Sequence, residues 1–174
     1  MIAETPIHWY GLPDLRDGSM DLKTWGLLPV ERWLARTMLN LSPAAFRLIM
    51  RDGKIDMIDV MGRNRILLRG LPQTARCFFI EQVFMPESIK ESQNYLYKQG
   101  QIRKALNGCT AKKIYWLVDS GQMVRELMPG GGFRYPHWGM EESLAIKVRD
   151  IHFQDQNNDL RRIQESKGPK QLGD

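Results

Sequence analysis

The chain has 174 residues, enough for one domain with a hydrophobic core, and 43% of them are hydrophobic while 26% are charged. Its longest apolar runs fall far short of the roughly 20 residues that span a bilayer, and residues 1–15 lack the charged start and apolar stretch of a secretory signal. We therefore expect a cytoplasmic protein without membrane insertion. The net charge of +5 permits a polyanionic partner without requiring one.

Cysteine and histidine are too sparse for a stabilising framework. Two cysteines exclude a disulfide scaffold, and three histidines without HxxxH or CxxC spacing argue against zinc. Cys77 lies inside an apolar run and is interpreted as a buried structural thiol. The sequence thus predicts no protein-held metal site.

The first part of the chain predicts two short helices. Residues 1–26 are rich in Pro, Gly, Asp and Trp and read as an ordered, extended lead-in. Apolar residues recur at helical spacing over 30–41. A second helix follows, with Ser42 as N-cap, Pro43 at the first helical position and Gly53 at its end. In a DNA-binding helix-turn-helix, the second helix would need exposed polar residues along one face. Here Arg47 is the only such residue in AAFRLIM, so packing is favoured over binding in a DNA groove.

The middle of the chain switches to a strand-like pattern. Residues 54–60 and 65–69 flank MGRN, which suits a hairpin turn. The segment ARCFFIEQVF, residues 75–84, is rich in aromatic and β-branched residues and predicts a buried strand. Pro86 then opens a predicted helix that Gly100 ends.

The last third is predicted as a hairpin, a strand and a polar tail. Residues 113–118 and 122–127 flank DSG, a second hairpin turn. Residues 143–151 alternate apolar and polar side chains, as in a half-buried strand. From 154 onward the chain is polar, with at most one short helix and a disordered end.

A basic stretch is the first candidate binding surface. Residues 98–113 hold five basic residues and no acidic one, preceded by two tyrosines. Such a patch attracts phosphates, and tyrosines can stack on bases. A solvated helix end is the alternative interpretation. The nucleic-acid-binding candidates are Tyr97, Lys98, Arg103, Lys104, Lys112 and Lys113.

The triple glycine in MPGGGFRYPHWGM is the second candidate site. Consecutive glycines let backbone amides converge on an anion. Arg134 could clamp phosphate oxygens with two donors, and His137 could carry a proton or bind a second phosphate. Glu126 leads into the loop and could help a metal hold a phosphate. The alternative is a hairpin exit in which the neighbouring aromatic residues pack on the core.

The predicted order of elements over residues 76–151 resembles the core of the ParB/sulfiredoxin superfamily. The segments that carry the resemblance are PESIKESQNYLYKQG, KIYWLVDSGQMVREL, GGGFRY and IKVRDI. In that family a glycine-and-arginine loop runs into a helix and holds nucleotide phosphates. Pro136 departs from the pattern, because it disfavours a helical residue before it. By resemblance, the nucleotide-binding candidates are Gly130, Gly131, Gly132, Arg134 and Tyr135, and the catalytic candidates are Glu126, Arg134 and His137.

The resemblance implies an α+β fold in three parts. A helical and hairpin portion occupies 1–75, a ParB/sulfiredoxin-like mixed sheet with flanking helices occupies 76–152, and a polar, partly disordered tail occupies 153–174.

The resemblance also implies a function. The glycine loop lacks the cysteine of sulfiredoxins, and no long helical DNA-binding region follows, as it does in partitioning proteins. Plasmid fertility-inhibition proteins of the oncogenic-suppression type remain. For that type the resemblance implies DNA binding, ATP and Mg²⁺ as ligands, and ATPase and DNase activity that inhibits conjugative DNA transfer through a type IV secretion system.

Two other functions stay open. The chain could be a non-enzymatic interaction protein, an inhibitor or chaperone of a plasmid, phage or secretion system, because its five Trp and ten Met suit a partner interface. A transcription regulator using residues 29–53 is the third alternative.

Overall fold

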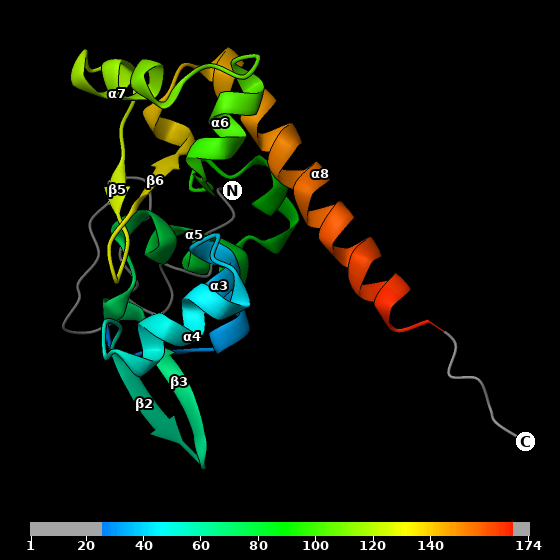
Figure 1. The fold of residues 1–174 in the computed structure, drawn as a ribbon. Helices are drawn as coiled ribbons and strands as arrows, with labels where there is room; N and C mark the ends of the chain where they lie inside the picture. The colour runs from blue at the N-terminus through cyan, green and yellow to red at the C-terminus, as the bar shows by residue number, and fades with distance from the viewer. Residues whose placement is uncertain (1–25, 169–174) are drawn as a thin grey trace, which may run out of the picture.

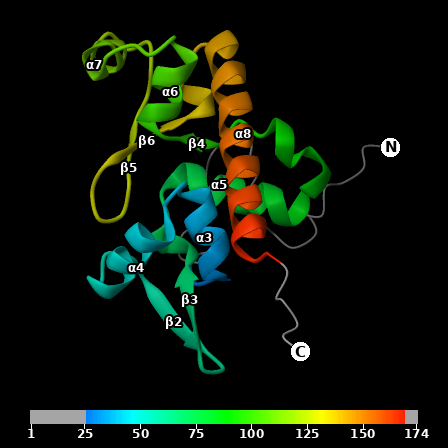
Figure 2. The same ribbon diagram turned by 45° about the vertical axis from the view of Figure 1, so that its right-hand side comes forward.

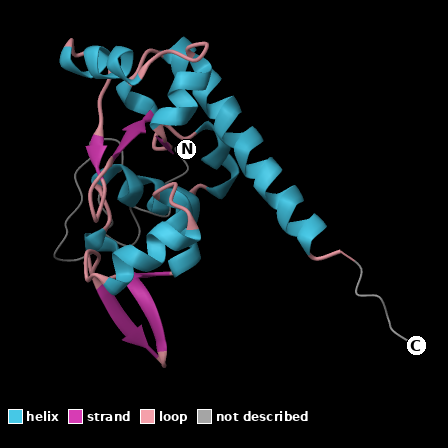
Figure 3. Cartoon of the chain, viewed as in Figure 1, coloured by secondary structure: helices cyan, strands magenta, loops and turns pink. Residues whose placement is uncertain are grey.

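A computed structural model describes residues 26–168 of the chain, in which helices surround small antiparallel sheets (Figures 1 and 3). The predicted α+β class is confirmed. Within the described residues both sheets are three-stranded and antiparallel, so the expected mixed sheet is not formed. The predicted lead-in over 1–26 and the end of the polar tail lie almost wholly outside the described residues. None of the described helices is both long and apolar enough to cross a membrane.

The first sheet supports two helices, and this part follows the prediction. Strand β1 (Pro29–Val30) is followed by α3 (Arg32–Met38) and α4 (Pro43–Arg51). Ser42 caps α4 as expected, since its Oγ accepts from the Ala45 amide at 3.2 Å. Strands β2 (Met57–Val60) and β3 (Arg63–Leu67) form the predicted hairpin, and a short 3₁₀ helix η2 (Leu68–Gly70) follows. The sheet order is β1-β3-β2.

The hairpin turn is a two-residue loop in the left-handed region. Met61 and Gly62 have φ of 54° and 78°, as a type I′ turn requires. The Asp59 carboxylate accepts from the Gly62 amide at 2.8 Å. Because Met61 is 98% exposed, its side chain contributes little packing to offset its strained backbone.

The expected strand at 75–84 is wrong, because these residues form helix α5 (Gln73–Phe84). Apolar side chains lie on every side of this helix, so no amphipathic period distinguishes it from a buried strand. Ala75, Cys77 and Ile80 are buried in this helix. The predicted burial of the Cys77 thiol is therefore confirmed, although the thiol lies in a helix and not in a strand.

The single helix predicted from Pro86 to Gly100 is also wrong. A 3₁₀ helix η3 (Pro86–Glu91) leads into strand β4 (Leu96–Tyr97), and Gly100 lies inside the next helix, α6 (Gln99–Ala105). Strand β4 forms because it pairs antiparallel with β6 (Phe133–Pro136), with Leu96 opposite Pro136 and Tyr97 opposite Tyr135.

The second half of the chain is more helical than predicted. The predicted DSG hairpin is wrong. Its first expected strand belongs to helix α7 (Ala111–Asp119), and only the last two residues of its second expected strand form a strand, β5 (Glu126–Leu127). The true hairpin pairs β5 with β6 (Phe133–Pro136), and the sheet order is β4-β6-β5. A 3₁₀ turn η4 (His137–Gly139) follows.

The predicted strand at 143–151 and most of the polar tail belong to one long helix, α8 (Glu142–Ser166). Ala145, Val148 and His152 are buried, and their separations of three and four residues mark a helical face that the alternating pattern masked. Figures 1 and 2 show α8 running from beside α6 past α3, with its last turns projecting from the body.

Two hydrophobic cores meet at β4. The first core lies under α3, α4 and the first sheet, and includes Leu39, Ile66 and Leu96. The second lies between α6, α7, the second sheet and α8, and includes Tyr97. Because successive strand residues point to opposite faces, the two residues of β4 fill different cores. The predicted boundary at residue 75 stays a prediction, although Leu96 and Met128, beyond it, pack in the first core.

The type I′ turn gives a stability prediction. Met61→Asn places a residue that tolerates positive φ at an exposed position and should raise the free energy of unfolding by about 0.5–1 kcal/mol. Met61→Val should lower it, because a β-branched residue fits this conformation worst. Urea denaturation of the three proteins measures the difference, and equal stability of the Asn and Val variants would contradict the turn assignment.

Candidate nucleic-acid interface

The triple glycine is the turn of the β5–β6 hairpin. Gly130, Gly131 and Gly132 have φ of 83°, 96° and 77°, which explains glycine at each position. The Gly131 amide donates to the Met128 carbonyl at 3.0 Å within the turn, so it is not free for an anion. A Cβ on Gly130 would lie 2.9 Å from a side-chain carbon of Ile49. The need for glycine here follows from the turn and from its contact with α4.

The Arg134 guanidinium contacts the end of α3. Its Nε donates to the Leu39 carbonyl at 3.1 Å and its Nη2 to the Asn40 carbonyl at 3.0 Å, while Nη1 bonds the Phe133 carbonyl. A cation is favoured at a helix C-terminus, where carbonyls lack helical partners. Burial lowers the pKa of Arg134. A phosphate clamp would have to replace these contacts.

His137 and Tyr135 are enclosed in the second core. His137 is 1% exposed, and its Nδ1 shares a hydrogen bond of 2.8 Å with the Tyr97 hydroxyl. Burial, and to a lesser degree Arg149, lowers the pKa of His137, so the ring is neutral near pH 7. Tyr135 is equally buried. Because both rings are enclosed, neither is available to a ligand at the surface.

Glu126 caps the N-terminal end of α5. Its Oε1 accepts from the Thr74 amide at 3.3 Å, and its Oε2 accepts from the Thr74 hydroxyl. Because Thr74 lies in the first turn of α5, this carboxylate serves as a cap supplied from a distant strand. Among residues 26–168, no group of three His, Cys, Asp or Glu is placed to hold a metal ion.

The basic stretch is divided between structural and exposed residues. Tyr97 is fully buried, so its ring is not available to stack on bases. Arg103 donates to the Cys109 carbonyl at 2.7 Å, and Lys104 pairs with Asp155 at 3.3 Å. Arg103 and Lys104 are exposed but hold these protein contacts. The other exposed candidates are Lys98, before α6, and Lys112 and Lys113 on α7, where Lys113 lies 4.3 Å from the Trp116 ring centre.

Another group of basic residues lines an open pocket of about 640 Å³ between α3, α4 and the β2–β3 hairpin. Among the described residues that line it, Glu31 is the only acidic one. We call it the arginine pocket, because its basic lining residues are Arg32, Arg36, Arg47, Arg63 and Arg65. Five guanidinium groups around one acid create a strongly positive local potential.

Local geometry explains why these arginines converge. Arg32 and Arg36 are four residues apart on α3 and share a face of that helix. Arg63 and Arg65 are two apart on β3 and share a face of that strand. The Arg47 side chain comes from α4. Sequence reasoning considered Arg47 alone, and the two regular spacings were the signal that could have identified the others.

Two arginines of the arginine pocket contact other protein groups, and the other three are without an ion pair among the described residues. Arg65 pairs with Glu31 at 2.8 Å, and Arg36 donates to the Leu41 carbonyl at 3.2 Å. Within the described part of the chain, the side chains of Arg32, Arg47 and Arg63 form no ion pair, and all three residues are exposed. The adjoining Trp33 is 60% exposed and lines the same pocket.

A polar cluster lies behind α3. His152 Nδ1 lies 3.2 Å from Gln101 Nε2 and 3.5 Å from Asn40 Nδ2, within hydrogen-bonding distance of both amides. Gln101 Nε2 also donates to Asp155 at 3.2 Å. Burial lowers the pKa of His152 to about 4, with Asp155 acting against the shift and Lys98 adding to it. The ring is therefore uncharged near pH 7.

Comparison with protein-family models, with curated proteins and with solved structures gives no match to this chain. The resemblance to the ParB/sulfiredoxin superfamily therefore rests on the sequence pattern, and several of the elements that carried it are built differently.

The contacts of Arg134 predict a structural role. Arg134→Met keeps the apolar stem but leaves the Leu39 and Asn40 carbonyls without their donors, so the free energy of unfolding should fall by about 1–3 kcal/mol. Arg125→Met removes an arginine at the edge of the same hairpin, whose guanidinium lies 4.0 Å from the Phe133 ring centre, and should cost less than 1 kcal/mol. Urea denaturation measures both, and equal losses would refute the assignment.

His152 predicts a pH dependence of stability. Its pKa in the fold, about 4, lies below the ordinary value of 6.5, so the unfolded chain takes up the proton first. Stability should therefore be full above pH 6.5, fall as the pH drops toward 4 and level below it, by on the order of 3 kcal/mol. His152→Gln should flatten this decline in urea denaturation between pH 7 and 4. Parallel curves for the two proteins would contradict the prediction.

Proposed function

We propose that the chain binds nucleic acid, with backbone phosphates held in the arginine pocket. The observation that carries the proposal is the convergence of five arginines on one open pocket in which Glu31 is the only described acidic lining residue. Surface arginines are ordinarily spread among acids, because like charges at close range repel. A polyanion removes that repulsion, and it gains affinity as counterions leave its phosphates.

The chemistry of the pocket suits phosphate. Guanidinium groups bind phosphate oxygens with two parallel donors, and Arg32, Arg47 and Arg63 have no competing ion pair among residues 26–168. Trp33 adds an aromatic face beside them on which a base can stack. This combination of cations and an exposed indole supports a nucleic acid over a simple anion.

The resemblance stated above makes DNA the expected nucleic acid. ATP hydrolysis with Mg²⁺, nuclease action and inhibition of conjugative transfer stay predictions of that resemblance alone. The residues it assigned to nucleotide chemistry contact protein groups: Arg134 binds the end of α3, and Glu126 caps α5. Our proposal is therefore binding, and it uses a different surface.

One observation favours a protein partner as the second candidate. Trp33, Trp116 and Trp138 are each half-exposed or more, and exposed tryptophans are common in protein interfaces. Salt separates the two candidates, because binding through phosphates weakens steeply with salt whereas apolar docking does not.

The proposal predicts a loss of affinity together with a smaller salt slope. Arg32→Gln combined with Arg63→Gln should weaken binding of a fluorescent oligonucleotide at least about 10-fold and reduce the slope of log affinity against log salt by about 1–2. Fluorescence anisotropy at several salt concentrations measures both quantities.

A matched control removes the same charge outside the pocket. Arg51→Gln combined with Arg161→Gln alters two exposed helix residues that do not line it. It should lower affinity only slightly, through net charge. Equal losses in the two double variants, or wild-type affinity in the pocket variant, would reject the arginine pocket as the binding surface.

A further inference from the structure

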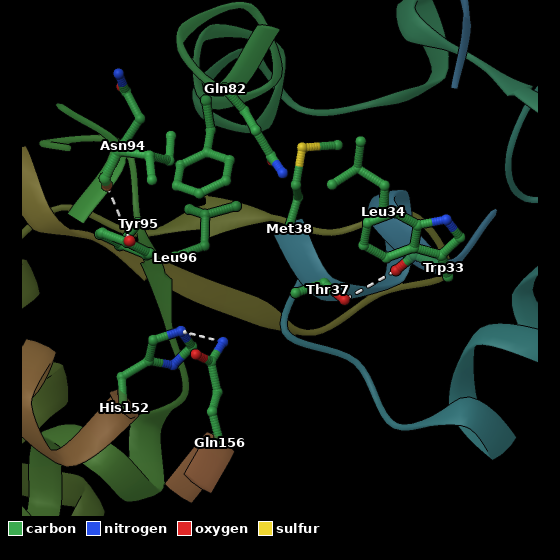
Figure 4. Close-up of a pocket in the computed structure, with 12 residues that line it drawn as sticks. Trp33, Leu34, Thr37, Met38, Gln82, Asn94, Tyr95, Leu96, His152 and Gln156 are labelled. Carbon is green, nitrogen blue, oxygen red and sulfur yellow. Dashed lines mark hydrogen bonds between the residues drawn. The ribbon is translucent and has the colours of Figure 1, made fainter. Parts of the chain in front are cut away.

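A second pocket, of about 180 Å³, lies on the other side of Trp33 (Figure 4). Its walls come from α3, α5, the segment that joins η3 to β4, and α8. Figure 4 shows Gln82 reaching in from α5 toward Met38, with His152 and Gln156 entering from α8. An engineered cavity of about 150 Å³ binds benzene, so a pocket of this size is large enough for one planar ring.

The lining selects an uncharged ligand. Among the described residues that line the pocket there is no Asp, Glu, Lys or Arg. The two titratable rings in the lining are uncharged near pH 7, because burial lowers the pKa of His152 to about 4 and raises that of Tyr95 to about 12. A charged group placed here would lose its hydration without gaining a counter-charge. Phe78 and Tyr95 supply aromatic walls instead, with ring centres 5.0 Å apart.

The side-chain amide of Gln82 lines this pocket, and Figure 4 shows its nitrogen on the side of Met38. Its Oε1 is buried and, among residues 26–168, has no hydrogen-bond partner. A buried polar atom without a partner is costly, and a half-turn of the amide would present that oxygen to a donor on a ligand and remove the cost. A side-chain amide both donates and accepts, which matches the edge of a nucleobase. Gln156, whose amide meets His152 at 3.1 Å, adds a second such group.

Trp33 connects this pocket to the arginine pocket, since it lines both. Arg32 precedes it and Arg36 follows it by three residues on α3. A strand whose phosphates lie on these arginines therefore passes the mouth of the small pocket. A base paired in a duplex cannot enter, whereas an unpaired base can turn out of the strand.

We propose that the pocket behind Trp33 takes one unpaired base, so that the protein binds single-stranded nucleic acid with a base in the pocket formed by Gln82, Phe78 and Tyr95. This inference rests on the proposed function for the strand, but the pocket itself can be tested with a free base. The ligand class is a planar, uncharged heterocycle with a donor on its edge.

The test compares three labelled oligonucleotides of one length: a single strand, the same backbone with abasic sites, and a duplex. The intact protein should bind the single strand roughly 10-fold more tightly than the abasic strand. Gln82→Met keeps the length of the side chain and removes its polar atoms, so it should reduce that preference while leaving abasic binding and its salt slope unchanged. Gln122→Met, at an exposed turn outside the pocket, is the control.

The outcomes separate the two proposals. Equal affinity for the base-bearing and abasic strands, tighter binding of the duplex, or an unchanged preference in Gln82→Met overturns the base pocket and leaves the arginine pocket standing. If no oligonucleotide binds, the proposed function fails, and calorimetric titration with free nucleosides decides the pocket. Binding that Gln82→Met weakens supports it, and no heat with any nucleoside overturns it.

Discussion

The guanidinium of Arg134 joins the two halves of the molecule. It belongs to β6, whose Tyr135 lies in the second core, yet its donors bind Leu39 and Asn40 at the end of α3 in the first. Asn40 has φ of 53° and turns the chain from α3 toward α4. Because this turn sets the angle between the two helices, the arrangement of the arginine pocket depends on a contact made by a residue outside it. One half-buried cation thus positions several exposed ones.

The start of the described chain could be predicted because its signals are local. Ser42 and Pro43 mark the first turn of α4 without help from the rest of the chain. Met61 and Gly62 likewise form a turn that two adjacent strands require. Such rules depend on neighbours in sequence, and they hold wherever the packed surroundings do not oppose them.

Residues 76–152 could not be predicted in this way, because their patterns allow two structures. The apolar residues of helix α5 are spread around the helix without an amphipathic period, so its pattern fits a buried strand equally well. In α8 the alternation of Leu144, Ile146 and Val148 coexists with a helical spacing of Ala145, Val148 and His152. Only packing against α6 and β4 decides between them, and that information is absent from the local sequence.

The candidate site shows the same division. The glycines, Arg134 and Glu126 stood out in sequence because they are chemically distinctive, and the fold uses them for a turn and two helix ends. The arginine pocket draws on α3, α4 and β3, and each of its residues looks like an ordinary solvated charge when read along the chain. What makes it a site is the meeting of three elements, which no single stretch of sequence contains.

Helix α8 carries one more consequence. Its first half is anchored by Ala145, Val148 and His152, whereas every residue from 157 to 168 is exposed. Starting a helix is unfavourable, and extending one adds a hydrogen bond for each residue fixed. The packed half therefore acts as a nucleus for the projecting half, which needs no core of its own. Fraying should begin at the C-terminal end and advance inward. The residue at which the helix ends should therefore vary from molecule to molecule.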